Sequence, residues 1–169
     1  WGFTSMMSQN SDSQLRRIIQ MEDDGDWHMR MNNARSVSTT TMDSFENDLD
    51  TFLSDKAFYK TNSNLVHMNT VKFFMDDVTE GGTAWLIDPY LQGPDPEWRS
   101  VPLLNVKVAG GYQASDENPS GAIYDKNGVL YWPDREPWEA FVTRLAEEGI
   151  QIHVHAIGEA AIRATLDVV

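Results

Sequence analysis

Two histidines stand two positions apart in the apolar run Gln-Ile-His-Val-His-Ala-Ile-Gly, residues 151–158. In a β-strand, residues two positions apart point to the same face, so His153 and His155 are predicted to share one face. The opposite face then carries the apolar residues Ile152, Val154 and Ala156. Two imidazoles on one face either hold a metal ion or fill a core, and the residues alone leave both interpretations open.

A lysine interrupts a second apolar run, Val-Lys-Phe-Phe-Met-Asp-Asp at 71–77. Strands of a parallel sheet are buried on both faces, and burial lowers the pKa of a lysine because it disfavours the ammonium form. A neutral amine at Lys72 can react with carbon dioxide to give a carbamate, an anionic oxygen ligand for one or two metal ions. Period-two geometry places Phe74 and Asp76 on the face of Lys72. The alternative is that Lys72 extends its ammonium out of the strand end to Asp76 or Asp77.

Strand and helix patterns alternate around these residues, which predicts an α/β fold with a parallel sheet wrapped by helices. One predicted helix carries an apolar stripe of Phe45, Leu49, Phe52 and Leu53. The predicted strands cover residues 1–7, 26–33, 70–77 and the histidine run, and the predicted helices cover 11–25, 41–58, 137–149 and 159–167.

Glycines and prolines break this rhythm between residues 78 and 136. We interpret the segment as a long loop or inserted hairpin region within a single domain that spans 1–169. The pair Asn127-Gly128 predicts a hairpin turn there. Tryptophans in and beside the segment either line a substrate pocket or form a small core of their own, namely Trp85, Trp98, Trp132 and Trp138.

Composition excludes several classes of partner and site. The 169 residues include 13 Lys and Arg against 26 Asp and Glu, a net charge of −13 that disfavours binding to nucleic acid or to an anionic membrane surface. The absence of cysteine excludes disulfides and thiolate ligands. No apolar stretch has the length of a membrane span, and neither a signal peptide nor an initial methionine is present. We therefore expect a cytoplasmic protein whose true N-terminus lies upstream.

The runs VKFFMDDVTEGGTAWLIDPY (71–90) and GIQIHVHAIGEAAIRATLD (149–167) resemble the core of the amidohydrolase superfamily. The closest likeness is to amidohydrolase family 3, the YtcJ-like metal-dependent hydrolases. WGFTSMMSQ and WHMRM resemble two earlier strands of that family, so the likeness covers most of the chain except 91–136. It implies a partial (β/α)₈ TIM barrel, of which this chain supplies about strands 2 to 5.

The resemblance also implies a site. Lys72 and His155 match metal ligands of the family, with Lys72 carboxylated. His153 matches a variable position, and we expect it to contact the core or the groups around the ligands. One or two divalent metal ions, most plausibly zinc, would serve hydrolysis of an amide-like C–N bond in a small molecule. The general base is an aspartate on the eighth strand, outside this chain.

Two positions depart from the family pattern, and several ligands are missing. The family has Asp-Gly where this chain has Asp76-Asp77, and Gly-Asp where it has Gly158-Glu159. The ligands of the first, sixth and eighth strands are absent, so the chain alone is expected to be inactive, and its open sheet edges favour a homodimer. The alternative is a non-catalytic α/β binding or regulatory module of flavodoxin-like layout, in which Lys72 and His155 are structural.

Overall fold

The structure is a computed structural model that describes residues 2–37, 42–88, 123–125, 127–132 and 135–169. Six strands and four α-helices occur in this part of the chain, together with one short 3₁₀ helix. In chain order they are β1 Ser5–Ser8, α1 Asp12–Asp23, β2 Arg30–Ser36, α2 Met42–Asn62, β3 Val66–Phe74, η1 Thr79–Gly81, β4 Ile123–Asp125, β5 Gly128–Leu130, α3 Arg135–Glu147, β6 Gln151–His155 and α4 Glu159–Leu166.

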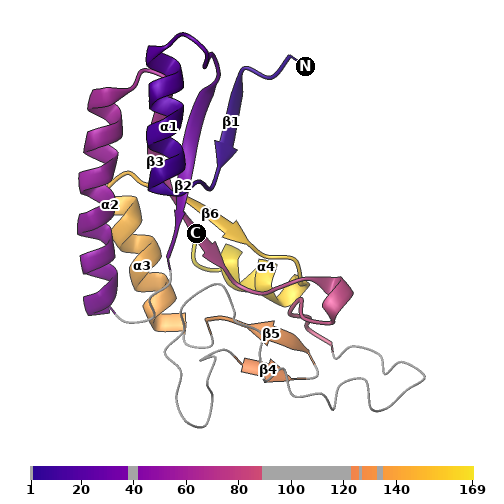
Figure 1. The fold of residues 1–169 in the computed structure, drawn as a ribbon. Helices are drawn as coiled ribbons and strands as arrows, with labels where there is room; N and C mark the ends of the chain where they lie inside the picture. Colours follow the sequence, from indigo (N-terminus) through magenta and orange to yellow (C-terminus); the bar gives the residue numbers. More distant parts are fainter. Residues whose placement is uncertain (1, 38–41, 89–122, 126, 133–134) are drawn as a thin grey trace.

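Four parallel strands form one sheet in the order β1-β2-β3-β6, and this sheet curls into a half-barrel (Figure 1). The order follows the chain, as it does in a barrel of repeated strand-helix units. A flavodoxin-like sheet instead places its first strand between others. Because β1 lies at an edge here, the structure argues against the flavodoxin-like alternative.

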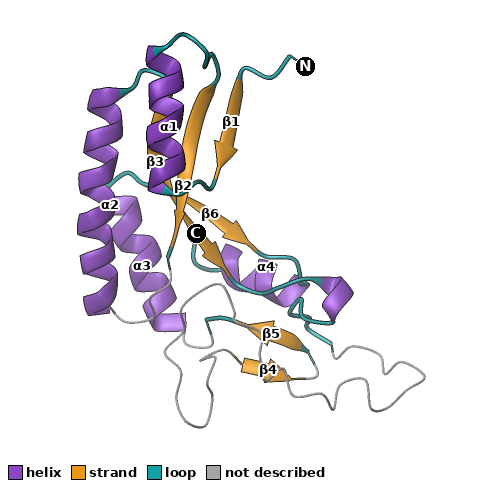
Figure 2. Cartoon of the chain, in the orientation of Figure 1, coloured by secondary structure: helices purple, strands orange, loops and turns teal. Residues whose placement is uncertain are grey.

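Helices α1, α2 and α3 lie side by side on one face of the sheet (Figure 2). Helix α1 begins with a capping box in which the Ser11 side chain accepts from the Gln14 N–H and the Gln14 side chain accepts from the Ser11 N–H. Its neighbour α2 contributes Phe45, whose ring stacks on Phe141 of α3 with centroids 4.1 Å apart. The predicted stripe on α2 therefore packs toward the core, with Phe45, Leu49 and Phe52 buried.

An aromatic core joins α3 to the sheet. Trp138 and Trp132 pack edge-on against Phe73, with centroids 4.7 and 5.7 Å from its ring. Both indoles are buried and belong to the hydrophobic core. Trp85 also packs against this core. Trp98 lies outside the described residues.

The strand β3 contains one extra residue, Asn69. Asn33 pairs with Met68 and Ala34 pairs with Thr70, which leaves Asn69 without a partner position on β2. The side chain of Asn32 fills this bulge, because its Oδ1 accepts the Asn69 N–H at 3.1 Å. The bulge shifts the alternation of side chains by one residue along β3.

The face of the sheet opposite the helices is called the inner face below. It carries a polar row near the start of β6, in which the Asn32 amide donates to Thr70 at 2.7 Å and Thr70 lies 3.2 Å from the Gln151 oxygen. Further along β3 and β6, every second side chain packs in the core, namely Val71, Phe73, Ile152 and Val154. The residues between and after them therefore lie on the inner face, and these are Lys72, Phe74, His153 and His155.

The strand bounds differ from the sequence-based prediction, and β1 covers 5–8 where 1–7 was expected. Strand β2 covers 30–36 where 26–33 was expected, because the Trp27 indole donates to the Met29 carbonyl in the segment before the strand. Strand β3 begins at Val66, not at residue 70. In the 78–136 segment, β4 and β5 form an antiparallel hairpin in which Gly128, the first residue of β5, pairs with Asp125. Residues 89–122 lie outside the described part. Within the described ranges, no helix is both long and apolar enough to cross a membrane.

Candidate functional site

Lys72 and His155 lie on neighbouring parallel strands, β3 and β6. Lys72 pairs with His153, and Phe74 pairs with His155, so His155 is one pair further along the inner face than Lys72. Both side chains are near the C-terminal ends of their strands. The structure thus brings together the two residues that the sequence singled out.

Lys72 is buried, with 7 % of its surface exposed. Its Nζ lies 4.8 Å from the centre of the Phe74 ring, a cation–π distance. Burial lowers the pKa of the Lys72 amine from its usual 10.5. Among the described residues no carboxylate lies within 4.0 Å of this amine, so the structure does not show the extension toward Asp76 or Asp77.

His153 is exposed on the inner face, directly opposite Lys72. We expected it to contact the core or the groups around the ligands, and the structure places it beside the lysine. Desolvation lowers the pKa of His153, and the charges of Lys72 and His155 lower it further. Its position therefore adds a third titratable side chain to the surroundings of Lys72 and His155.

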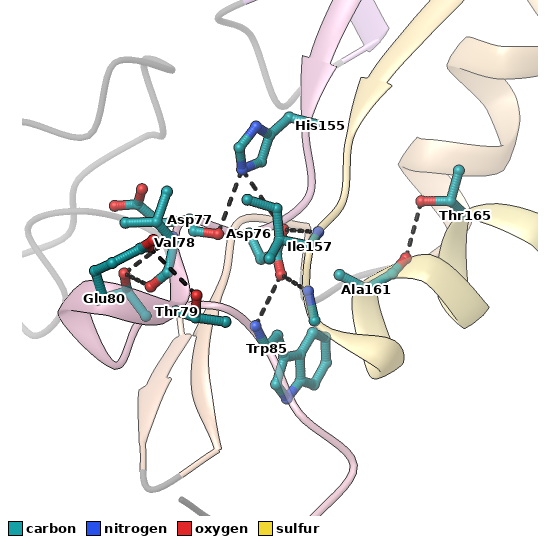
Figure 3. Close-up of polar contacts among 12 residues, drawn as sticks. Asp76, Asp77, Val78, Thr79, Glu80, Trp85, His155, Ile157, Ala161 and Thr165 are labelled. Carbon is teal, nitrogen blue, oxygen red and sulfur yellow. Dashed lines mark hydrogen bonds and ion pairs between the residues drawn. The ribbon is translucent and has the colours of Figure 1, made fainter.

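The His155 ring is oriented by the residues that follow β3 (Figure 3). Its Nε2 lies 3.3 Å from the backbone carbonyl of Asp77 and 4.0 Å from Oδ1 of Asp76. A carbonyl can only accept, so this contact requires the tautomer in which Nε2 carries the proton. The lone pair is then on Nδ1, which is the nitrogen free to bind a metal ion.

Asp76 does not share the strand face of Lys72 as predicted, because β3 ends at Phe74. Its carboxylate is fully buried and accepts three backbone hydrogen bonds. The donors are the N–H groups of Trp85 at 2.8 Å, Ile157 at 3.0 Å and Gly158 at 2.7 Å (Figure 3). Sequence reasoning missed this role, because all three donors are backbone groups and two of them, Ile157 and Gly158, are 81 and 82 positions away.

Gly158 and Glu159 complete the contact between α4 and the turn after β3. A Cβ on Gly158 would lie 1.9 Å from the Trp85 carbonyl oxygen, so only glycine fits this close approach. The Glu159 carboxylate accepts the Ile87 N–H at 3.2 Å. Glu159 thus holds Ile87 against the start of α4.

In the described ranges, no cluster of three or more His, Asp or Glu side chains has the geometry of a metal site. Within the described residues, Lys72 and His155 therefore make at most a partial ligand set. The inner face supplies nitrogen donors, whereas the nearest carboxylate, Asp76, is occupied by backbone amides.

Comparison with known proteins gives one structural likeness. No protein-family model matches the chain, and no curated protein matches it either. The fold is similar to the crystal structure of an uncharacterized metal-dependent hydrolase from Pyrococcus horikoshii OT3, with a TM-score of 0.56 and 20 % identity. The match covers 97 % of this chain and 25 % of that chain, so this chain spans about a quarter of its length. At this identity the likeness shows a shared fold.

Proposed function

We propose that this chain is the central part of a metal-dependent amidohydrolase, and that the intact protein forms a (β/α)₈ barrel which hydrolyses amide-like C–N bonds in small molecules. The observation that carries the proposal is the placement of Lys72 and His155 on one face of neighbouring parallel strands, near their C-terminal ends. Barrel enzymes place their chemistry at that end of the strands. The fold shared with a metal-dependent hydrolase supports the same assignment.

Lys72 would supply an oxygen ligand after reaction with carbon dioxide. The amine nitrogen attacks the carbon of carbon dioxide, a C–N bond forms, and one proton leaves the nitrogen to give a carbamate anion. The reaction needs the neutral amine, and the lowered pKa of the buried Lys72 makes that form more accessible.

His155 would supply a nitrogen ligand through Nδ1, since its Nε2 faces the Asp77 carbonyl. Metal-bound histidines commonly donate their other N–H to a carbonyl or carboxylate, which fixes ring orientation. A bound divalent ion, with zinc favoured by the imidazole donor, would polarise the substrate carbonyl and lower the pKa of a bound water. The remaining ligands and the general base would come from strands outside this chain.

The experiment is a calorimetric titration of the 169-residue chain with Zn²⁺. We expect weak binding at one site, lost in His155→Ala and weakened in Lys72→Met, because each change removes one of the two proposed ligands. His28→Ala is the matched control, since His28 is exposed and lies before β2. Absence of binding, or binding that survives His155→Ala, would contradict the proposal. Amide hydrolysis by the isolated chain is not expected, because the other ligands are absent.

A further inference from the structure

We propose that Asp76 is a positioning residue that holds the His155 ring in place through the backbone on both sides of it. This inference rests on the metal-ligand role proposed for His155, but it concerns Asp76, which the proposed function does not use. Asp76 has no exposed surface, so it cannot contact a substrate or a metal ion in this arrangement. It acts through the residues that it binds.

The first step of the argument is the cost of burying a carboxylate. A buried carboxylate must be hydrogen-bonded to be retained, and Asp76 meets that need with three backbone N–H donors. Two of the donors, Ile157 and Gly158, lie two and three positions after His155, while Trp85 belongs to the segment after β3. One side chain therefore ties the end of β3 to the segment that carries His155.

The second step is the contact with the ring itself. Met75 donates its N–H to the His155 carbonyl at 2.9 Å, and the Asp77 carbonyl lies 3.3 Å from His155 Nε2. Asp76 stands between these two residues, with its Oδ1 at 4.0 Å from the same nitrogen. Residues 75–77 thus fix both the backbone and the ring of His155, and Asp76 is the member that holds them against β6 and α4.

The test uses Asp76→Asn in the 169-residue chain. Asparagine keeps the size of the side chain but replaces one acceptor oxygen with an NH₂ donor, so at least one of the three backbone N–H groups loses its partner. We expect hydrogen exchange at the amides of Trp85, Ile157 and Gly158 to accelerate by about tenfold. We also expect the Nε2–H proton of His155, slowed in exchange by its carbonyl partner, to disappear from the ¹⁵N–¹H spectrum. Zn²⁺ affinity should fall by about 10- to 100-fold.

Thr165→Val is the matched control for general loosening near the site. The Thr165 hydroxyl donates to the Ala161 carbonyl at 2.9 Å within α4, so the variant removes a hydrogen bond close to Gly158 without changing one made by residues 75–77. We expect Thr165→Val to leave the His155 ring proton and the Zn²⁺ affinity unchanged. If the two variants alter both readouts equally, Asp76 has only a structural role and the proposal is overturned.

Two further outcomes separate the proposals. A wild-type chain that binds no Zn²⁺, but whose His155 ring proton is lost in Asp76→Asn, overturns the metal function and supports the positioning role. Should Asp76→Asn fail to fold, scalar couplings across the hydrogen bonds from the Trp85, Ile157 and Gly158 amides to the Asp76 carboxyl carbon are measured in the wild-type chain. Their presence together with the ring proton supports the proposal, and their absence overturns it.

Discussion

At the scale of the residue, Lys72 links stability to pH. Its pKa is lower in the folded chain than its usual 10.5, so the unfolded chain binds the proton more tightly. Below the folded pKa both states are protonated, and the folded state carries the full cost of the buried ammonium. Stability must therefore rise as pH increases from the folded pKa of Lys72 toward 10.5.

We predict that Lys72→Met increases the free energy of unfolding near neutral pH by about 1 kcal/mol, because it removes the desolvated ammonium and keeps the buried volume. In this variant the free energy of unfolding should also rise less with pH in the alkaline range, because Lys72 no longer titrates there. Urea unfolding at several pH values measures both effects. Lys60→Met, at an exposed position on α2, should change neither. A less stable Lys72→Met variant with the wild-type pH profile would show that Lys72 is not penalised by burial.

The candidate site could be predicted in part from single residues. Lys72 and His155 stand out because a lysine and paired histidines are unusual within apolar runs, and the structure places them on one face as period-two geometry requires. Asp76 could not be assigned from such patterns. Its partner Gly158 is 82 positions away, and the bond uses a backbone group that every residue except proline possesses.

At the scale of the element, the contact between α4 and the turn after β3 depends on the absence of a side chain at Gly158. We predict that Gly158→Ala lowers the free energy of unfolding by more than about 2 kcal/mol, because the added Cβ would overlap the Trp85 carbonyl and force the segments apart. Thermal and urea unfolding measure the loss.

Gly149→Ala separates this overlap from ordinary backbone strain. Gly149 has a φ of +62°, and nothing lies within 4 Å of where its Cβ would be. Its substitution should cost only about 1 kcal/mol for the left-handed conformation. Equal losses in the two variants would show that the approach of Trp85 to Gly158 is not close in solution.

The types of the elements were predictable, and their boundaries were less so. Helices α1 and α3 have terminal signals in the sequence, such as Ser11 before α1 and Gly149 after α3. The start of β3 was missed because the bulge at Asn69 interrupts the alternation of side chains. A pattern search recognises the second half of that strand as one unit and leaves out Val66–Met68.

At the scale of the whole molecule, β1 and β6 are the two edge strands of the curled sheet, and neither pairs with a further strand among the described residues. Apolar side chains are exposed near both: Phe3, Met6 and Met7 at one edge, and Ile162, Leu166 and Val169 on or beyond α4. Unpaired strand edges with apolar neighbours favour pairing with another chain.

We therefore predict that the isolated chain self-associates with increasing concentration, as measured by sedimentation velocity. Met7→Lys should weaken this association, because a charge at the β1 edge opposes strand pairing. Gln20→Lys adds the same charge at an exposed position on α1 and should leave association unchanged. A chain that remains monomeric over the whole accessible concentration range would refute pairing through the edges.

The bulge at Asn69 also determines where this strand tolerates a change in length. Loss of one residue from a regular strand moves every later side chain to the other face. Removal of Asn69 would instead leave every later side chain on its present face, because Asn69 is the extra residue of the bulge. Met68 would then be followed directly by Thr70, the alternation would be unbroken, and Lys72 would still face inward. Single-residue insertions and deletions in related sequences can therefore be absorbed at this position, while any such change between Thr70 and Lys72 would turn the lysine toward the helices.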